Sequence, residues 1–215
     1  MSFNLTCFRR KTSRPKVARS VLPAIIGALI WGLGPFGPAP QQFGTASAQS
    51  VSGARFPSFE LVGRLGAKHT GATLFEKPSV VHFGFTRCPV ICPTTLYEMA
   101  ERMNSLGASA VDYNFIFITV DPERDTPDAL DEYLNSFDDR IVGLSGKPEE
   151  VQKIAMWLGA QYSKVATSNG DYTMDHSANA FLVARGGVLV SSLYMGYGAK
   201  EAQTLSALSA LLKIK

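Results

Sequence analysis

The sequence predicts an α/β fold in which a mixed β-sheet is flanked by helices, and three observations support this. Continuous apolar runs at residues 79–85 and 113–120 suit strands that are covered on both faces. Segments with helical spacing follow both runs, as in βαβ units. Two further apolar runs, at 178–184 and 188–194, flank an Arg-Gly-Gly turn that is typical of a β-hairpin.

The length and charge of the chain indicate one globular domain with an appendage. The chain has 215 residues, with 21 Lys and Arg against 18 Asp and Glu. Six of those bases and none of the acids lie in residues 1–48, so the other 167 residues carry a net charge of −3. Binding to nucleic acid depends on clustered basic charge, and this mildly acidic domain therefore argues against it.

The first 48 residues have the organisation of an export signal. Basic residues at 9–19 precede an apolar stretch at 21–36, and an A-x-A site ends at Ala48. This order predicts a signal peptide that is cleaved after Ala48. The alternative is an uncut N-terminal anchor, but Pro and Gly interrupt the apolar stretch, which is shorter than the roughly 20 residues that span a bilayer.

We therefore expect residues 1–48 to be a signal peptide or anchor, 49–57 a linker, and 58–215 the folded domain. The domain is expected to be periplasmic or otherwise extracytoplasmic, either soluble after cleavage or tethered to the membrane by its N-terminal segment. Cys7 would leave with the signal, so the mature domain would keep two cysteines in an oxidising compartment.

The order of elements within the domain is thioredoxin-like: βαβ, a helix, then ββα, preceded by an N-terminal hairpin extension. Helix boundaries are read from Pro in a first turn, from a Thr cap, and from Gly after a last turn. Polar, Gly-containing residues at 163–175 are expected to form a loop. The other expected elements are a hairpin at 59–66 and 72–75, a strand at 141–144, and helices at 93–106, 126–137, 148–158 and 201–214.

The residues with the most distinctive chemistry are Cys88 and Cys92, which lie where the strand at 79–85 gives way to a helix. Ligand sites in open α/β sheets favour this edge, and a helix N-terminus favours thiolate over thiol. The spacing is C-x-x-x-C rather than the C-x-x-C of thioredoxin-like redox proteins. The pair can form a disulfide or face one metal ion. A purely structural disulfide is the simpler alternative, although so short a loop stabilises little.

A metal site would need a third ligand, because two thiolates are too few for a closed site. The chain has three histidines. His69 is expected in an exposed turn, and His82 is expected to be a hydrogen-bonded sheet histidine. His176 precedes the strand at 178–184 and can approach the cysteine turn, but its position alone leaves open whether it is a ligand. Two sulfurs and one imidazole would suit Cu(I) in three-coordinate geometry.

An acidic loop, Asp121-Pro122-Glu123-Arg124-Asp125, follows the strand at 113–120. Its carboxylates suggest Mg²⁺ or Ca²⁺ as one possibility, but the spacing is not that of an EF-hand. The interpretation favoured here is a charged, mostly solvated turn in which Arg124 pairs with a neighbouring acid.

Three segments together resemble the Sco/SenC copper chaperones of cytochrome c oxidase assembly: residues 83–96 (FGFTRCPVICPTTL), 120–127 (VDPERDTP) and 175–178 (DHSA). The resemblance implies a thioredoxin-like fold with Cu(I) or Cu(II) held by Cys88, Cys92 and His176. It also implies copper delivery to the binuclear copper site of oxidase subunit II, or reduction of that site's cysteines.

By the same resemblance, the implied partners are oxidase subunit II, its assembly factors and other copper chaperones. The sequence departs from the family pattern at two positions beside the cysteines. Val90 stands where an acidic residue is usual, and Arg87 stands where His is common. Neither departure removes an implied copper ligand.

Three functions follow from these observations. The favoured one is a copper-binding assembly factor, which is not a conventional enzyme. The second is an exported thiol–disulfide reductase in which Cys88 and Cys92 are the catalytic redox pair, and it can coexist with the first. The third is a binding module in which the same cysteines form a structural disulfide.

Overall fold

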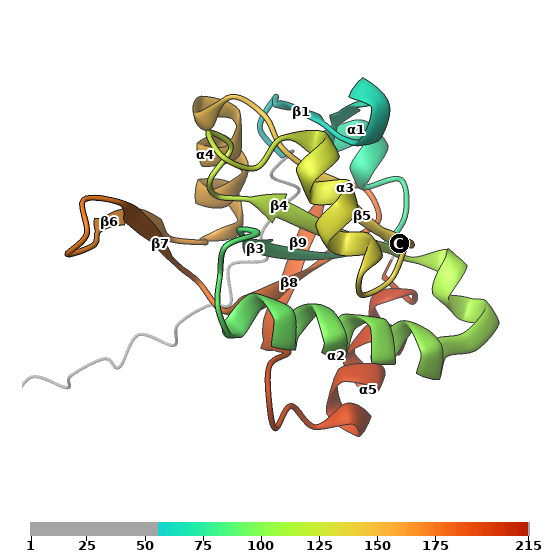
Figure 1. Ribbon diagram of the computed structural model, residues 1–215. Coiled ribbons are helices and arrows are strands. Elements are labelled where there is room, and N and C mark those ends of the chain that lie inside the picture. The colour runs from blue at the N-terminus through green and yellow to red at the C-terminus, as the bar shows by residue number, and fades with distance from the viewer. Residues whose placement is uncertain (1–55, 215) are drawn as a thin grey trace, which may run out of the picture. The chain divides into compact units, whose positions relative to one another are not determined.

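The computed structural model describes residues 56–214, which form a mixed α/β domain (Figure 1). The predicted signal or anchor at 1–48 and most of the predicted linker at 49–57 lie outside the described residues. In the described part of the chain, no helix is long and apolar enough to cross a membrane. The central five-stranded sheet has the order β5-β4-β3-β8-β9. Its strands are β3 (Ser79–Gly84), β4 (Asn114–Thr119), β5 (Ile141–Leu144), β8 (Asn179–Ala184) and β9 (Val188–Tyr194).

The mixed sheet expected from the sequence is confirmed. Strands β3, β4 and β5 are parallel, while β8 and β9 add antiparallel pairs on the other side of β3. All six residues of β3 are buried, as its continuous apolar character predicts. Gly186 and Gly187, both with positive φ, make the tight turn between β8 and β9.

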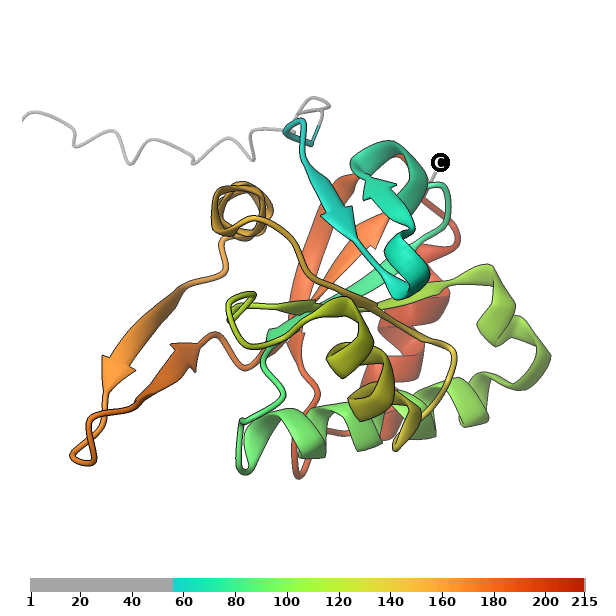
Figure 2. The same cartoon turned by 45° about the horizontal axis from the view of Figure 1, so that its top comes forward.

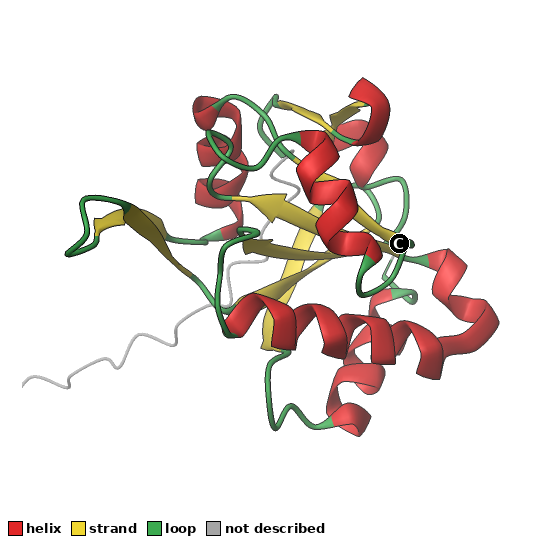
Figure 3. Ribbon diagram, viewed as in Figure 1, coloured by secondary structure: helices red, strands yellow, loops and turns green. Residues whose placement is uncertain are grey.

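Helices cover both faces of the sheet. The helices are α2 (Ile91–Leu106), α3 (Pro127–Asn135), α4 (Pro148–Leu158) and α5 (Glu201–Leu211). The crossovers from β3 to β4 and from β4 to β5 run in the same direction, so right-handed connections place α2 and α3 on one face. Figure 2 shows α4 on the far side of the sheet from α2, and Figure 3 separates helices from strands by colour.

The helix ends follow the predicted signals with small shifts. The Thr126 side chain accepts a hydrogen bond of 3.2 Å from the backbone N–H of Ala129, which caps α3. Gly159 ends α4 in the left-handed conformation. Helix α2 begins at Ile91, two residues before the predicted start, and Pro93 therefore lies in its first turn.

The N-terminal hairpin is confirmed, but its second arm was placed wrongly. The pair consists of β1 (Glu60–Val62) and β2 (Lys68–Thr70), joined by the 3-10 turn Arg64–Gly66. The residues assigned to the second arm, 72–75, instead lie largely in the short helix α1 (Gly71–Leu74). A capping box between Thr70 and Thr73 starts this helical turn. A second 3-10 segment, Gly107–Asp112, leads from α2 into β4.

The prediction of a loop at residues 163–175 is also wrong. These residues form a two-stranded hairpin, β6 (Tyr162–Ala166) and β7 (Tyr172–His176), which projects from the body of the domain in Figure 1. Most of β6 is exposed, so the strand carries polar residues and lacks the apolar alternation of a half-buried strand. The hairpin is important because its last residue is His176.

Candidate metal centre

The turn between β3 and α2 brings the two cysteine side chains together. The backbone N–H of Cys92, in the first turn of α2, donates a hydrogen bond of 3.4 Å to the Sγ of Cys88. That N–H has no partner inside the helix, and the helix cap residue Val90 offers no side-chain acceptor. The sulfur of Cys88 therefore serves as the acceptor at the helix N-terminus, where negative charge is favoured.

Gly84, the last residue of β3, lets the second sulfur approach the sheet. A Cβ atom added at this glycine would lie 2.7 Å from the Sγ of Cys92 and 2.7 Å from the ring of Phe117. Any side chain at position 84 would therefore push Cys92 or Phe117 out of place. Cys92 is fully buried, whereas Cys88 keeps 7% of its surface exposed. Cys88 is thus the sulfur that an incoming molecule reaches first.

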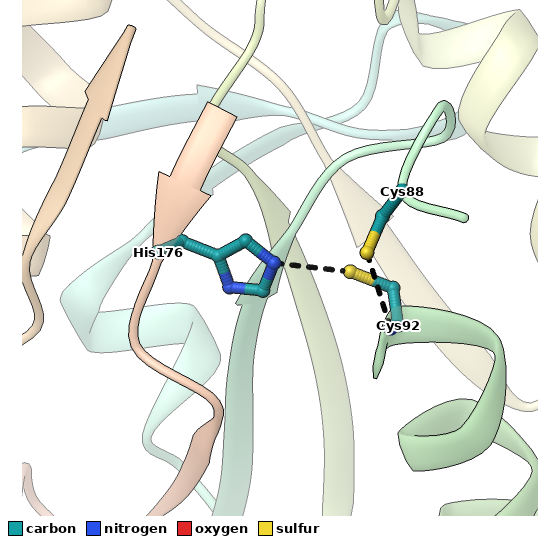
Figure 4. Close-up of side chains that lie close together, drawn as sticks. All are labelled: Cys88, Cys92 and His176. Carbon is teal, nitrogen blue, oxygen red and sulfur yellow. Dashed lines mark hydrogen bonds between the residues drawn. The ribbon is translucent and has the colours of Figure 1, made fainter. Parts of the chain in front are cut away.

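His176 reaches the cysteines from the end of the β6–β7 hairpin. Its Nε2 lies 3.3 Å from the Sγ of Cys92, as Figure 4 shows. Its Nδ1 lies 3.1 Å from the carbonyl oxygen of Ser177, an acceptor, so Nδ1 carries the proton and Nε2 presents a lone pair. The base of the hairpin is held by Ser177, whose backbone N–H donates to the carbonyl of Gln161.

The three residues form a compact donor set. In the described part of the chain, Cys88, Cys92 and His176 are a group whose ligand atoms all lie within 4.8 Å of one another. Both cysteines are free thiols. The oriented lone pair of His176 and the two sulfurs fit a soft ion such as Cu(I), and a carbonyl on the other ring nitrogen is the usual support of a metal-binding histidine. The structure thus brings together the three residues that the family resemblance implied as ligands.

The two thiols differ in acidity. The hydrogen bond from the Cys92 side chain is the largest effect and lowers the pKa of Cys88. Burial opposes this effect, and the hydrogen bond from the backbone N–H of Cys92 lowers the pKa of Cys88 further. The same side-chain contact, together with burial, raises the pKa of Cys92. A thiolate at Cys88 and a thiol at Cys92 are therefore the stable pair without a metal. The expected acidic thiol at the helix start is therefore found at Cys88 but not at Cys92.

The other two histidines lie outside this group. His69 is half-buried in β2, on the hairpin with β1, rather than in an exposed turn. His82 is a fully buried residue of β3, as predicted, but only its Nδ1 has a partner, the carbonyl of Asn179 at 3.3 Å. Its Nε2 has no hydrogen-bond partner within residues 56–214. Burial and the neighbouring His176 lower the pKa of His82 to about 4, so its ring is neutral at pH 7.

The acidic loop after β4 is a structural junction rather than a mostly solvated turn. Arg124 does pair with Asp121, as predicted. However, Asp121 and Asp125 are both buried, which corrects the view of their charges as mostly solvated. Asp125 accepts hydrogen bonds from the N–H and hydroxyl of Thr86, at 3.0 and 2.6 Å, and from the hydroxyl of Thr119 at 2.7 Å. Thr86 lies two residues before Cys88, so this carboxylate holds the cysteine turn against β4.

The same loop also holds the hairpin that carries His176. The hydroxyl of Tyr172, on β7, donates to the Oδ1 of Asp121 at 2.8 Å. Arg124 donates to the backbone carbonyl of Tyr172 at 3.0 Å. On the ring of Tyr172, the Nζ of Lys164 lies 4.1 Å from the centroid, and it pairs with Glu123 at 2.8 Å. Nothing in the local sequence pattern connects Thr86 or Tyr172 to the acidic loop, so neither residue could be predicted to support the site.

The fold and the site together define a class: a thioredoxin-like domain with a C-x-x-x-C pair at the start of a helix and a histidine brought in by a hairpin. Residues 48–213 match the model of the SCO1/SenC family, and the chain belongs to that family. The match confirms the resemblance that was drawn from the three sequence segments.

Individual relatives agree in sequence and in structure. The chain is 35% identical over 145 residues to a SCO2-like protein of Rickettsia conorii, covering 66% of this chain and 71% of that protein. It is similar to the structure of Bradyrhizobium japonicum ScoI with copper bound, with a TM-score of 0.67 and 40% identity, covering 74% of this chain and all of that one. Arabidopsis thaliana ScoI with copper bound gives a TM-score of 0.66 at 31% identity, covering 74% of this chain and 99% of that one.

Proposed function

We propose that this protein binds copper through Cys88, Cys92 and His176 and serves in the assembly of cytochrome c oxidase. The observation that carries the proposal is the set of two sulfurs and one oriented imidazole nitrogen within 4.8 Å. Copper-bound structures of two ScoI relatives support the identity of the metal. BsSco, a member of the Sco family of cytochrome c oxidase assembly proteins, has the same fold at 21% identity.

In this role copper is cargo. The acceptor would be the binuclear copper site of oxidase subunit II, to which the protein delivers copper or whose cysteines it first reduces. Cys88 is the more exposed of the two sulfurs, so an acceptor thiolate would begin the ligand exchange there. The work would take place outside the cytoplasm, at the periplasmic side of the membrane, as the basic and apolar N-terminal segment suggests.

The test is an anaerobic Cu(I) titration of the reduced protein against a competing chelator. We expect one Cu(I) per chain, with at least a tenfold loss of affinity in His176→Ala and a larger loss in Cys88→Ser or Cys92→Ser. His69→Ala removes an imidazole on β2 and is the matched control, expected to match the wild type. An unchanged affinity in His176→Ala would show that the three-ligand site is wrong.

The unequal acidity of the two cysteines supports a second function, thiol–disulfide reduction. The Cys88 thiolate would attack a disulfide of the substrate, form a mixed disulfide and release one substrate thiolate. Cys92, after losing its proton, would then attack Cys88, leaving a Cys88–Cys92 disulfide and a reduced substrate. This function predicts turnover with a disulfide substrate that does not need His176. A rate no greater than that of a free thiol would exclude it.

A further inference from the structure

His82 is a buried imidazole beside the metal centre with one nitrogen unused. It lies on β3, and its side chain is fully buried. The centre of its ring lies 6.0 Å from that of His176, with the two ring planes at 74°. Its Nε2 has no hydrogen-bond partner in the described part of the chain. A buried polar atom without a partner costs stability, and in a native protein it calls for an explanation.

The two histidines hold their protons in the same way. In His82, Nδ1 lies 3.3 Å from the backbone carbonyl of Asn179, and in His176, Nδ1 lies 3.1 Å from the carbonyl of Ser177. A carbonyl is only an acceptor, so Nδ1 is the donor in both rings and each Nε2 presents a lone pair. This support by a backbone carbonyl is typical of metal-binding histidines.

The position of His82 in the sheet places it on the side of β3 that faces the cysteines. Side chains two residues apart on a strand share a face, so His82 points to the same side as Gly84. That side is where the Sγ of Cys92 approaches β3. With metal–nitrogen bonds of about 2.1 Å, two imidazoles on one ion can have ring centres up to about 6.4 Å apart. The observed 6.0 Å between His82 and His176 is within this limit.

We propose that His82 is a fourth copper ligand, which binds through Nε2 when the copper is Cu(II). The inference rests on the proposed copper function and deepens it. Cu(I) is satisfied by the three ligands already within 4.8 Å of one another, a group that does not include His82. Cu(II) favours a larger, tetragonal set than Cu(I), so the nitrogen of His82 would supply a fourth donor. His82 then favours Cu(II) over Cu(I) in this site.

The experiment is pulsed EPR of the wild-type protein loaded with one equivalent of Cu(II), which counts the imidazoles bound to the metal. It is repeated on His82→Phe, which keeps a ring in the buried space, and on His69→Phe as the control for losing an imidazole elsewhere. Chelator competition gives the Cu(I) and Cu(II) affinities of each variant. Thermal unfolding shows whether His82→Phe folds. If this variant does not fold, the number of imidazoles in the wild-type spectrum still decides whether a second histidine binds Cu(II).

We expect two imidazoles on Cu(II) in the wild type and in His69→Phe, and one in His82→Phe. We also expect His82→Phe to lose at least tenfold in Cu(II) affinity while its Cu(I) affinity stays within about twofold. A single imidazole in the wild type, or a site that cannot hold Cu(II), would overturn the role of His82. If Cu(I) still binds normally, the proposed copper function of Cys88, Cys92 and His176 stands whether or not His82 is a ligand. If the protein binds no copper at all, the proposed copper function is itself refuted.

Discussion

The guanidinium of Arg124 lies over the ring of Tyr172, 3.7 Å from its centroid. Arg124 belongs to the acidic loop after β4, and Tyr172 belongs to the hairpin that ends at His176. At its other end the loop holds the cysteine turn, through Asp125 and Thr86. One loop is therefore bonded to both segments that supply the sulfur and nitrogen donors, and the distance between those donors depends on it.

Tyr172→Phe tests this connection with the loss of one oxygen atom. The variant removes the hydrogen bond to Asp121 but keeps the ring on which Arg124 lies. A hydrogen bond to a carboxylate contributes about 1.5 kcal/mol or more when it is buried, and less here because Tyr172 is partly exposed. We expect Cu(I) affinity to fall about three- to tenfold, and the amides of β6 and β7 to exchange their hydrogens faster.

The control for this variant is Tyr197→Phe, which removes a hydroxyl from a ring that is 88% exposed, outside the acidic loop and the β6–β7 hairpin. It should leave both copper affinity and hydrogen exchange as in the wild type. If Tyr172→Phe behaves like this control, the hairpin is positioned by its base at Gln161 and Ser177 instead.

Asp125→Asn should destabilise the whole domain. The fully buried carboxylate accepts three hydrogen bonds, one at Oδ1 and two at Oδ2. Asn keeps only one acceptor oxygen, so at least one of the three bonds is lost. We expect the free energy of unfolding to fall by about 2–4 kcal/mol, measured by urea denaturation. Asp128→Asn, at an exposed position in the first turn of α3, should cost no more than about 1 kcal/mol. Equal losses in the two variants would mean that the buried network contributes little.

Local patterns were sufficient to predict most of the fold. The buried strands β3 and β4, the capped helix α3 and the glycine turn between β8 and β9 each have a signal within a few residues. The β6–β7 hairpin has no such signal, because most of β6 is exposed and therefore lacks the apolar alternation of a half-buried strand. A hairpin of this kind looks polar and irregular in sequence.

The site was predictable only in part, for a related reason. Cys88 and Cys92 could be placed from the strand before them and the helix after them. The contact of His176 with Cys92 joins residues 84 positions apart, and that of Tyr172 with Asp121 joins residues 51 apart. Such contacts depend on the tertiary fold, so residues alone left the role of His176 open until the family resemblance was considered.

The unequal acidity of the cysteines gives the reduced, metal-free protein a characteristic dependence on pH. The pKa of Cys88 is lowered in the folded state, so its contribution to stability is present above its unfolded pKa and is lost as pH falls toward the folded value. Stability should therefore rise from pH 5 to pH 8, relative to Cys88→Ser, by at most about 1.4 kcal/mol per pH unit. Urea denaturation at several pH values measures this difference.

Cys92 has the opposite sign, because its pKa is raised in the folded state. Its contribution is fully present below the unfolded pKa and is lost as pH rises above it, so the difference from Cys92→Ser should shrink above about pH 9. Parallel stability curves for the wild type and Cys88→Ser between pH 5 and 8 would contradict the assignment of the thiolate to Cys88.

Val90 gives the most direct way to improve the helix that carries the site. It is the cap residue of α2, it is 68% exposed, and its own side chain makes no capping hydrogen bond. Asp at this position would complement the helix dipole. It would gain no capping hydrogen bond, because Pro93 has no N–H and the N–H of Cys92 already donates to Cys88. We therefore expect Val90→Asp to raise the free energy of unfolding of the copper-loaded protein by about 0.5 kcal/mol.

Val90→Asn has the same shape as Val90→Asp without the charge, so it is the matched control. Val90→Asp should stabilise the copper-loaded protein, whereas Val90→Asn should change its stability little. In the metal-free protein the Asp carboxylate lies close to the Cys88 thiolate, and the repulsion should reduce the gain of Val90→Asp. Thermal unfolding of both variants, with and without copper, measures the two effects. An equal gain for Val90→Asp with and without copper would show that Cys88 carries no negative charge in the metal-free protein.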